Sequence, residues 1–323
     1  IAVSKLKWLS QRPIKSIKNI SFSSLSLRHM IKTWVKELLK KIFYTCAIRS
    51  LHAVNRKRGR LETIKKIASI VPDISDQYST WAINPSSVYD VVKIRSIQAF
   101  QVDLALTALR GLCNASREDP LFVVDIGDSS GTHTKYLQEL CPELGIGDVD
   151  FLSVNLDSAA VEKILAKGGN AIQSRAEDLH QIIGDQRHPD VYLSFQSLEH
   201  FFDPISFLRD LAVETSTENF VITVPYMKRS RVGLKHLRNP DLSERFTEIN
   251  AENTHIFELS PEDWKLIFRF SGWRPVHEEV FYMTPSRHPL SLFRYALRRY
   301  DFEGFYGVIL KKSLQESELY RDW

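Results

Sequence analysis

Hydrophobic and polar positions follow two periodic patterns along most of the chain. Short apolar runs, of which LFVVDIG at 121–127 is the clearest, are typical of strands buried on both faces of a parallel sheet. Between these runs, apolar positions recur three and four residues apart, which predicts helices. Strands are predicted at 121–127, 150–155, 191–195, 220–224, 275–282 and 305–310, and helices at 60–70, 88–112, 132–141, 158–167, 204–213, 261–270 and 290–300. This alternation predicts an α/β fold with a doubly wound parallel sheet.

The first 60 residues differ from the rest of the chain in charge. They contain fifteen Lys or Arg and one acid, a net charge of +14, whereas the remaining 28 basic and 38 acidic residues give −10. Within this segment, 27–54 has an apolar stripe at helical spacing that includes Trp34 and Phe43, with lysines mostly off the stripe. This helix either binds an anionic membrane surface or packs on the rest of the chain. We expect a basic arm at 1–60, a helical lead-in at 61–112 and an α/β domain at 113–323.

Composition argues against several classes of protein. Hydrophobic residues make up 43% of the chain and charged residues 25%, a balance typical of a globular protein with a large core. No run approaches the roughly 18 uncharged apolar residues of a spanning helix, which argues against an integral membrane protein. Three scattered cysteines are too few for a disulfide framework and indicate a reducing compartment. We expect a cytoplasmic protein, which would be peripheral to a membrane if the basic helix binds one. The N-terminal residues are rich in Ser and lack acids, a composition that is also typical of organelle-targeting peptides.

The loop after the first predicted strand has the composition of a ligand-binding turn. Residues 125–131 read DIGDSSG and run directly into the helix predicted at 132–141. Glycines at 127 and 131 allow a tight turn and a close approach of the backbone to a ligand, and the amides of a helix start attract anionic groups. The loop lacks the G-x-G-x-x-G spacing of a dinucleotide site, which argues against a nicotinamide or flavin enzyme.

A second loop carries a more specific pattern. Residues 194–204 read SFQSLEHFFDP, which resembles the S-x-x-x-L-E-H-x-x-D-P signature in the small-molecule branch of the class I S-adenosylmethionine-dependent methyltransferases. The D-x-G-x-x-x-G pattern at 125–131 is similar to the first motif of the same family. The resemblance covers about residues 90–312. It implies a Rossmann-like, doubly wound seven-stranded sheet with a final antiparallel strand, and S-adenosylmethionine as the cofactor. Methyl transfer from a sulfonium does not itself require a metal.

The resemblance also implies which residues bind the cofactor. The loop at 125–131 would shape the pocket for the methionine half, and the turn at 174–179 would contact the adenine. Asn155 stands where the family has its ribose-binding acid, so Asp157 two residues later is the alternative acceptor for the ribose hydroxyls. The candidate cofactor-binding residues are Asp125, Gly127, Asp128, Ser129, Gly131, Asn155, Asp157, Ala176, Glu177 and Gln196.

Two histidines are the candidate catalytic residues. Methyl transfer requires an acceptor held in line with the methyl group, and a base if the acceptor is a hydroxyl. His200, in the second loop, and His255 could each supply that base, or could be a helix cap or an ordinary polar contact. The polar residues 252–254 could orient the imidazole of His255, which favours this residue. Glu199 is expected to hydrogen-bond to the backbone of its own loop.

Three functions remain open at the level of sequence. The first is a methyltransferase that acts on a small-molecule, lipid or glycan acceptor, with 27–54 at an anionic membrane surface. The second is a methyltransferase fold that has lost catalysis, because of Asn155 and the 128–130 loop, and serves as an interaction module. The third is a nucleic-acid partner that uses the basic arm; the second loop lacks the Asn- or Asp-Pro-Pro-aromatic sequence of base-modifying enzymes. Basic stretches at 228–238 and 294–299 are solvated loops or bind an anionic acceptor.

Overall fold

The computed structural model describes residues 24–75, 77, 83–113, 119–183, 187–233, 254–283 and 304–320. The helix predicted at 290–300, its basic residues, the polar residues 252–253 and the basic residues 235–238 lie outside these ranges. The chain forms two compact units, Ile1–Thr45 and Cys46–Trp323.

A long helix, α1 (Ser24–Lys57), contributes residues to both units. In the first unit, the side chains at 32–42 are exposed, with Trp34 at 66% and Leu39 at 60%. From Cys46 onward the same helix belongs to the second unit, where Leu51 is buried against Phe100 and Phe281. Asn55 Nδ2 also donates a hydrogen bond to Ser96 Oγ over 2.8 Å. The apolar stripe predicted at 27–54 therefore has a buried part and an exposed part.

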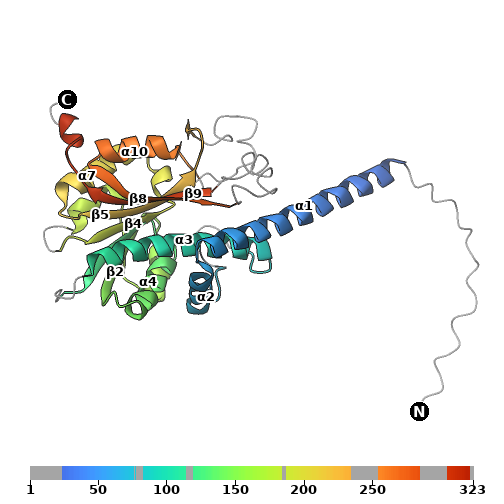
Figure 1. The fold of residues 1–323 in the computed structure, drawn as a ribbon, viewed down its shortest axis with the longest axis horizontal. Helices are drawn as coiled ribbons and strands as arrows, with labels where there is room; N and C mark the ends of the chain where they lie inside the picture. The colour runs from blue at the N-terminus through green and yellow to red at the C-terminus, as the bar shows by residue number, and fades with distance from the viewer. Residues whose placement is uncertain are drawn as a thin grey trace, which may run out of the picture. The chain divides into compact units, whose positions relative to one another are not determined.

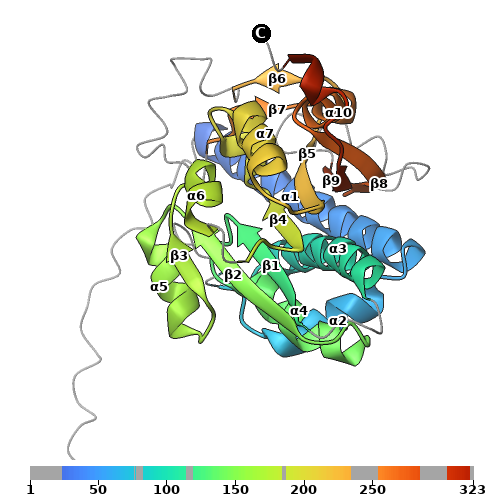
Figure 2. The ribbon, with the colours of Figure 1, turned by 90° about the vertical axis from the view of Figure 1, so that its left-hand side faces the viewer.

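The second unit is built on a seven-stranded sheet with the order β3-β2-β1-β4-β5-β9-β8 (Figures 1 and 2). Its strands are β1 (Leu121–Ile126), β2 (Val149–Asn155), β3 (Ala171–Gln173), β4 (Val191–Phe195), β5 (Asn219–Tyr226), β8 (Trp273–Tyr282) and β9 (Gly304–Lys312). Strands β1 to β5 pair in parallel, and β9 runs antiparallel to both β5 and β8. This arrangement confirms the predicted doubly wound sheet with a late antiparallel strand. It is the class I methyltransferase fold that the resemblance implied.

Helices cover both faces of this sheet. Besides the end of α1, the described residues of the second unit form the helices α2 (Leu61–Ile70), α3 (Val88–Leu112), α4 (Thr132–Glu143), α5 (Ser158–Ala166), α6 (Leu179–Ile183), α7 (Pro204–Glu214) and α10 (Pro261–Phe270). Figure 1 shows α7 and α10 on one side of the sheet and α2, α3 and α4 on the other. Short elements follow several strands: the 3₁₀ helices η1 (Ala176–Asp178), η2 (Leu198–His200) and η4 (Ser317–Tyr320), and the paired strands β6 (Arg231–Val232) and β7 (Phe257–Glu258).

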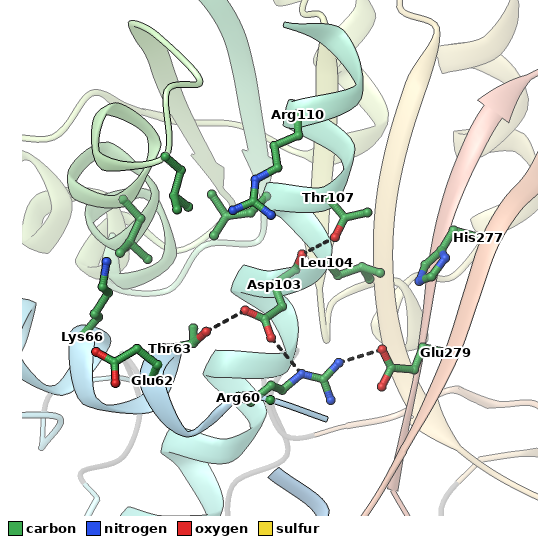
Figure 3. A pocket seen from close by; sticks show the side chains of 14 residues that line it. Arg60, Glu62, Thr63, Lys66, Asp103, Leu104, Thr107, Arg110, His277 and Glu279 are labelled. Atoms are coloured by element: carbon green, nitrogen blue, oxygen red, sulfur yellow. Dashed lines mark hydrogen bonds and ion pairs between the residues drawn. The ribbon is translucent and has the colours of Figure 1, made fainter. Parts of the chain in front are cut away.

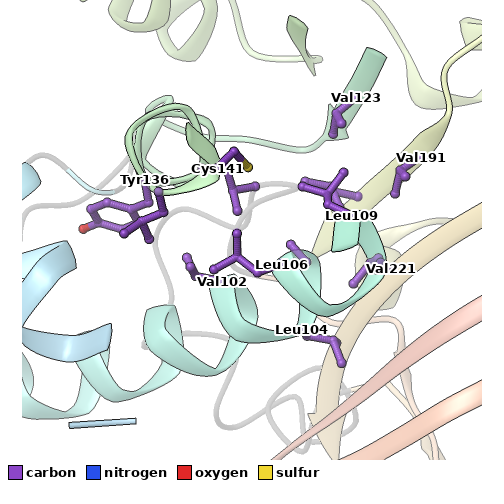
Figure 4. Close-up of a cluster of buried hydrophobic side chains, with 14 of the residues drawn as sticks. Val102, Leu104, Leu106, Leu109, Val123, Tyr136, Cys141, Val191 and Val221 are labelled. Carbon is purple, nitrogen blue, oxygen red and sulfur yellow. The ribbon is translucent and has the colours of Figure 1, made fainter. Parts of the chain in front are cut away.

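The period-2 alternation of the strands separates the two large core clusters, one on each face of the sheet. Val123 points to the face that α3 and α4 cover, in the cluster that also contains Leu109, Tyr136 and Val191 (Figure 4). Val124, the next residue, packs on the opposite face with side chains of α7 and α10. Both sides of β1 are therefore buried, which explains its continuous apolar run.

Local capping fixes where the helices nearest to the strand ends begin. Asp203, the last acid of the second loop, is the N-cap of α7, and its Oδ1 accepts a hydrogen bond from Ser206 N over 3.0 Å. Pro204 takes the first helical position, where its missing N–H is not needed. Hydrogen bonds from Ser206 lower the pKa of Asp203. The Asp-Pro pair of the second loop therefore starts a helix.

Candidate functional site

The glycine loop joins β1 to α4 at the carboxyl ends of the parallel strands, next to β4. Gly127 and Gly131 have φ of +86° and +71°, a region that L side chains rarely adopt. A Cβ at Gly127 would lie 2.1 Å from Ser197 Oγ, in the loop after β4. The two loops are therefore in direct contact, and a glycine at 127 is a steric requirement.

Asp128 organises the glycine loop from inside. Its carboxylate is almost fully buried, with Oδ1 accepting a hydrogen bond from Gly131 N at 2.9 Å. Its Oδ2 accepts one from Ser153 Oγ, also at 2.9 Å, and Ser129 Oγ donates to the carbonyl of Gln77 at 2.7 Å. These bonds tie the loop to β2 and to the segment that precedes α3. Asp128 and Ser129 thus hold the loop in shape with their side chains.

Asp125, at the end of β1, is a buried carboxyl beside this loop. It is 1% exposed, and its Oδ2 has no hydrogen-bond partner among the described residues. Burial, together with the negative charge of Asp128, raises the pKa of Asp125 well above its usual range. A carboxyl in this condition destabilises the folded chain at neutral pH, which is a frequent mark of a functional position.

Asn155 and Asp157, the two candidates for the ribose, are both engaged locally. Asn155 Nδ2 donates to the carbonyl of Asp128 at 2.9 Å, and its Oδ1 accepts from Asp157 N at 2.8 Å. Asp157 is the N-cap of α5, and its Oδ1 accepts from Ala159 N at 3.0 Å. Asn155 therefore bonds to the glycine loop through Nδ2 and to the start of α5 through Oδ1, whereas Asp157 uses one carboxylate oxygen as a cap.

The turn predicted to contact adenine forms η1 and leads into α6. Ala176 is half-buried and packs at the edge of the core cluster that contains Leu179. Glu177 forms an ion pair with Arg175 at 3.4 Å, and the Arg175 side chain is mostly exposed. The turn thus offers a small apolar side chain with an exposed charged pair beside it.

Gln196, directly after β4, has a strained backbone. With φ of +61° it is the one non-glycine residue of the described ranges in the left-handed region. Its N–H donates to the carbonyl of Thr223 at 2.8 Å. Such strain is found most often at functional sites, because the surrounding structure must hold it in place. The geometry thus singles out the strand end at which the sequence placed Gln196.

A buried polar network behind Gln196 was not anticipated from the sequence. Gln101 of α3 donates through Nε2 to Thr223 Oγ1 at 3.2 Å, and its Oε1 lies 2.9 Å from His133 Nε2. Burial lowers the pKa of His133. The signal in the sequence was a Gln at 101 directly between the apolar residues Phe100 and Val102 of the helix predicted at 88–112. The network connects β5, α3 and α4 below the glycine loop.

The two candidate bases lie together. Their ring centroids are 4.7 Å apart in an edge-to-face arrangement. His255 Nδ1 lies 3.0 Å from Glu258 Oε1, and His200 Nδ1 lies 2.9 Å from the carbonyl of Thr254. Glu258 is fully buried on β7 and also accepts a hydrogen bond from Arg231 of β6. The β6–β7 pair therefore orients the imidazole of His255.

Glu199 lies beside these histidines and differs from the expectation. Its backbone carbonyl accepts from Ile256 N at 2.8 Å, but both carboxylate oxygens are buried without a hydrogen-bond partner among the described residues. Burial, with some repulsion from Glu258, raises the pKa of Glu199 to about 7 against the attraction of His255. Burial alone would lower the pKa of His255, but the hydrogen bond to Glu258 and the charge of Glu199 raise it. Burial alone would likewise raise the pKa of Glu258, but His255 and Arg231 lower it.

A separate pocket of about 450 Å³ lies between α2, α3 and β8 (Figure 3). Arg60 crosses one end of it, donating through Nε to Asp103 at 3.0 Å and through Nη2 to Glu279 at 2.6 Å. Its guanidinium also stacks 5.0 Å from the ring centroid of Phe100. The pocket contains none of the candidate cofactor-binding residues. Its ion pairs tie the start of α2 to α3 and the sheet.

Comparison with known proteins yields structural likenesses only. No family model and no curated protein matches the chain. An S-adenosylmethionine-dependent methyltransferase from Mesorhizobium loti is similar at 15% identity, over 65% of this chain and 100% of its own, with a TM-score of 0.44. The 1,6-didemethyltoxoflavin-N1-methyltransferase of Burkholderia thailandensis is similar at 16% identity, over 71% of this chain and 84% of its own, with a TM-score of 0.45. The [4+2]-cyclase SpnF is similar at 11% identity, over 80% of this chain and 95% of its own, with a TM-score of 0.46. The strand order and directions, rather than these likenesses, show that the chain has the class I methyltransferase fold.

Proposed function

We propose that the protein is an S-adenosylmethionine-dependent methyltransferase that acts on a small-molecule, lipid or glycan acceptor. The observation that carries the proposal is the contact between the glycine loop after β1 and the loop after β4. These strands are neighbours at the point where the order of the sheet reverses. In open α/β sheets, ligands bind outside the carboxyl ends of the strands at this point.

Each candidate cofactor residue has a role that its contacts support. The backbone at Gly127 and Gly131 would approach the methionine half of the cofactor, and the buried carboxyl of Asp125 would face its positive charge. Asp128 and Ser129 would act indirectly, by holding the loop. Gln196 would present its strained backbone, or its side chain, to the cofactor from the end of β4.

The ribose and adenine would lie beyond the end of β2. Because both ends of the Asn155 amide already bond to backbone groups and the amide carries no charge, we assign the ribose hydroxyls to Asp157, whose carboxylate has a second oxygen besides the one that caps α5. Ala176 would pack against the adenine ring, with Glu177 at its edge. The loss of the usual acid at 155 predicts a weaker grip on the ribose.

In the absence of any metal, the acceptor would transfer its proton to His255. The Glu258 carboxylate accepts from Nδ1, so Nε2 of the neutral ring carries the lone pair that can take a proton. As the sulfonium methyl moves to the acceptor oxygen or nitrogen, the electron pair of the broken C–S bond returns to sulfur and S-adenosylhomocysteine leaves. His200 would position the ring of His255 across the edge-to-face contact.

The exposed part of α1 supports a lipid surface as the place of action. Trp34, Leu38 and Leu39 are exposed on a segment that also carries Lys32, Lys36, Lys40 and Lys41. This combination suits the interface of an anionic membrane, with the apolar side chains among acyl chains and the lysines at headgroups. None of the helices that the structure describes combines the length and apolar composition needed to cross a bilayer.

Calorimetric titration with S-adenosylmethionine and S-adenosylhomocysteine tests the proposal. The wild-type chain should bind both with a Kd of the order of micromolar, about −8 kcal/mol. Gly127→Ala should weaken binding, because its Cβ displaces the loop after β4, whereas Gly147→Ala should not. Gly147 also has a positive φ (+83°), and no atom lies within 4 Å of the point that a Cβ there would occupy. A folded wild-type chain that binds neither compound would favour the interaction-module alternative.

A further inference from the structure

We propose that Glu199, His200 and His255 bind a divalent transition-metal ion. Within the described residues, one potential ligand atom from each of the three lies within 4.8 Å of the other two. Two of the ligands come from η2 after β4 and the third from the segment before β7. The hydrogen bond from Ile256 N to the carbonyl of Glu199 joins these two segments at 2.8 Å.

The histidines are held as metal-binding histidines usually are. His200 Nδ1 faces a backbone carbonyl, which can only accept, and His255 Nδ1 faces the carboxylate of Glu258. Each neutral ring therefore carries its hydrogen on Nδ1 and its lone pair on Nε2. Outer hydrogen bonds of this kind, to carboxylates or carbonyls, fix the tautomer and orientation of ligating histidines in metalloproteins.

Glu199 supplies an independent reason for a cation. Its carboxyl is fully buried and neither oxygen has a hydrogen-bond partner in the described part of the chain. A buried carboxylate without partners is strongly unfavourable unless a cation or a set of donors is supplied. The other buried glutamate of the cluster, Glu258, already has Arg231 and His255. Glu199 is thus the carboxyl of the cluster that no cationic side chain of the described residues hydrogen-bonds.

The donor set selects the kind of metal. Two imidazole nitrogens and one carboxylate oxygen suit Zn²⁺, Co²⁺, Mn²⁺ or Fe²⁺, whereas Mg²⁺ and Ca²⁺ prefer oxygen donors. Three protein ligands leave at least one position open, which is typical of catalytic rather than structural sites. A bound ion would occupy both imidazoles and would itself lower the pKa of an acceptor hydroxyl placed at the open position. The inference therefore goes beyond the proposed function and does not require cofactor binding.

A second group of potential metal ligands has similar spacing but is a weaker candidate for a metal site. Asp125, Asp128 and His133 also bring potential ligand atoms within 4.8 Å. Both carboxylate oxygens of Asp128, however, accept hydrogen bonds from the glycine loop and from Ser153, so an ion would have to break the loop apart. We therefore place the metal at the Glu199 cluster.

The test is a titration of the full-length, chelator-treated protein with Co²⁺, followed by visible absorption, and with Zn²⁺, followed by calorimetry. We expect one ion per chain, with Mg²⁺ binding far more weakly. Glu199→Gln and His255→Ala should each lower the affinity at least 100-fold, and the outer-shell change Glu258→Gln should lower it about 10- to 100-fold. His277→Ala, at an exposed histidine of β8, should leave the affinity unchanged.

Two results would overturn the metal site: no binding of Co²⁺ or Zn²⁺ by the folded wild-type chain, or binding that Glu199→Gln leaves intact. Glu199→Gln preserves shape and removes only the charge, so it decides the question if the histidine variants fail to fold, which circular dichroism would show. Titration of the same samples with S-adenosylmethionine separates this outcome from the proposed function. Metal binding without binding of S-adenosylmethionine would refute only the proposed function, and binding of S-adenosylmethionine without metal binding would refute only the metal site.

Discussion

Replacement of Gly127 by alanine should destabilise the protein through two separable effects. The first is backbone strain, since an L residue at φ of +86° costs about 1–2 kcal/mol. The second is a collision, because the new Cβ would lie 2.1 Å from Ser197 Oγ and 2.8 Å from Ser197 Cβ. Overpacking of this kind costs about 1–3 kcal/mol. The total expected loss in the free energy of unfolding is about 2–5 kcal/mol.

Gly147→Ala and Ser197→Gly isolate the collision. Gly147 has nearly the same φ, +83°, and no atom lies within 4 Å of the point that a Cβ there would occupy, so its alanine variant carries the strain alone. Urea unfolding should therefore place Gly127→Ala about 1–3 kcal/mol below Gly147→Ala. In the Ser197→Gly background, which lacks both atoms that the Cβ would meet, this difference should nearly vanish. A difference below about 0.5 kcal/mol in the wild-type background would refute the inferred contact between the two loops.

Two further outcomes follow, one from a buried carboxyl and one from exposed apolar side chains. Because the pKa of Asp125 is raised in the folded state, its contribution to stability is full below the unfolded pKa of about 3.9 and is lost as pH rises through the folded value. Asp125→Asn should thus raise the melting temperature at pH 8, by the equivalent of about 1–3 kcal/mol, and have little effect near pH 4; equal melting at pH 8 would contradict the assignment. Trp34→Ala combined with Leu39→Ala should reduce binding to phosphatidylserine vesicles at least tenfold in a sedimentation assay, since each buried side chain contributes about 1.5–3 kcal/mol. If neither substitution changes vesicle binding, and binding falls steeply as the salt concentration rises, the result would instead favour a nucleic-acid partner.

The sequence predicts most of the sheet because most of its strands are buried on both faces. The run at 121–127 is continuous for that reason, and the same holds for 191–195 and 220–224. The strand β3 (Ala171–Gln173) was not predicted, since it is three residues long, lies at the edge of the sheet and has no fully buried side chain. Its place is fixed by pairing with β2, which is a non-local interaction that no local pattern reports.

The site was predicted less completely, because its contacts join distant parts of the chain. The sequence placed His200 and His255 separately, and only the fold brings their rings together. The two bonds of the Asn155 amide are likewise made by the fold: its Nδ2 donates to the carbonyl of Asp128, and its Oδ1 accepts from Asp157 N. The capping role of Asp157, by contrast, could have been inferred from an acid directly before the helix predicted at 158–167.

The positions of two unmatched carboxyls bear on whether the fold still works as an enzyme. Asp125 lies near the end of β1 and Glu199 follows β4, the neighbouring strands at which the order of the sheet reverses. A chain that used this fold only as an interaction module would gain stability if both became neutral, since Asp125 Oδ2 and both carboxylate oxygens of Glu199 are buried without a hydrogen-bond partner among the described residues. A sulfonium cofactor at the first carboxyl and a divalent cation at the second would each supply the missing positive charge. If Asp125→Asn and Glu199→Gln both stabilise the ligand-stripped protein, and each removes the binding of its own cation, the two carboxyls are held in place by function rather than by folding.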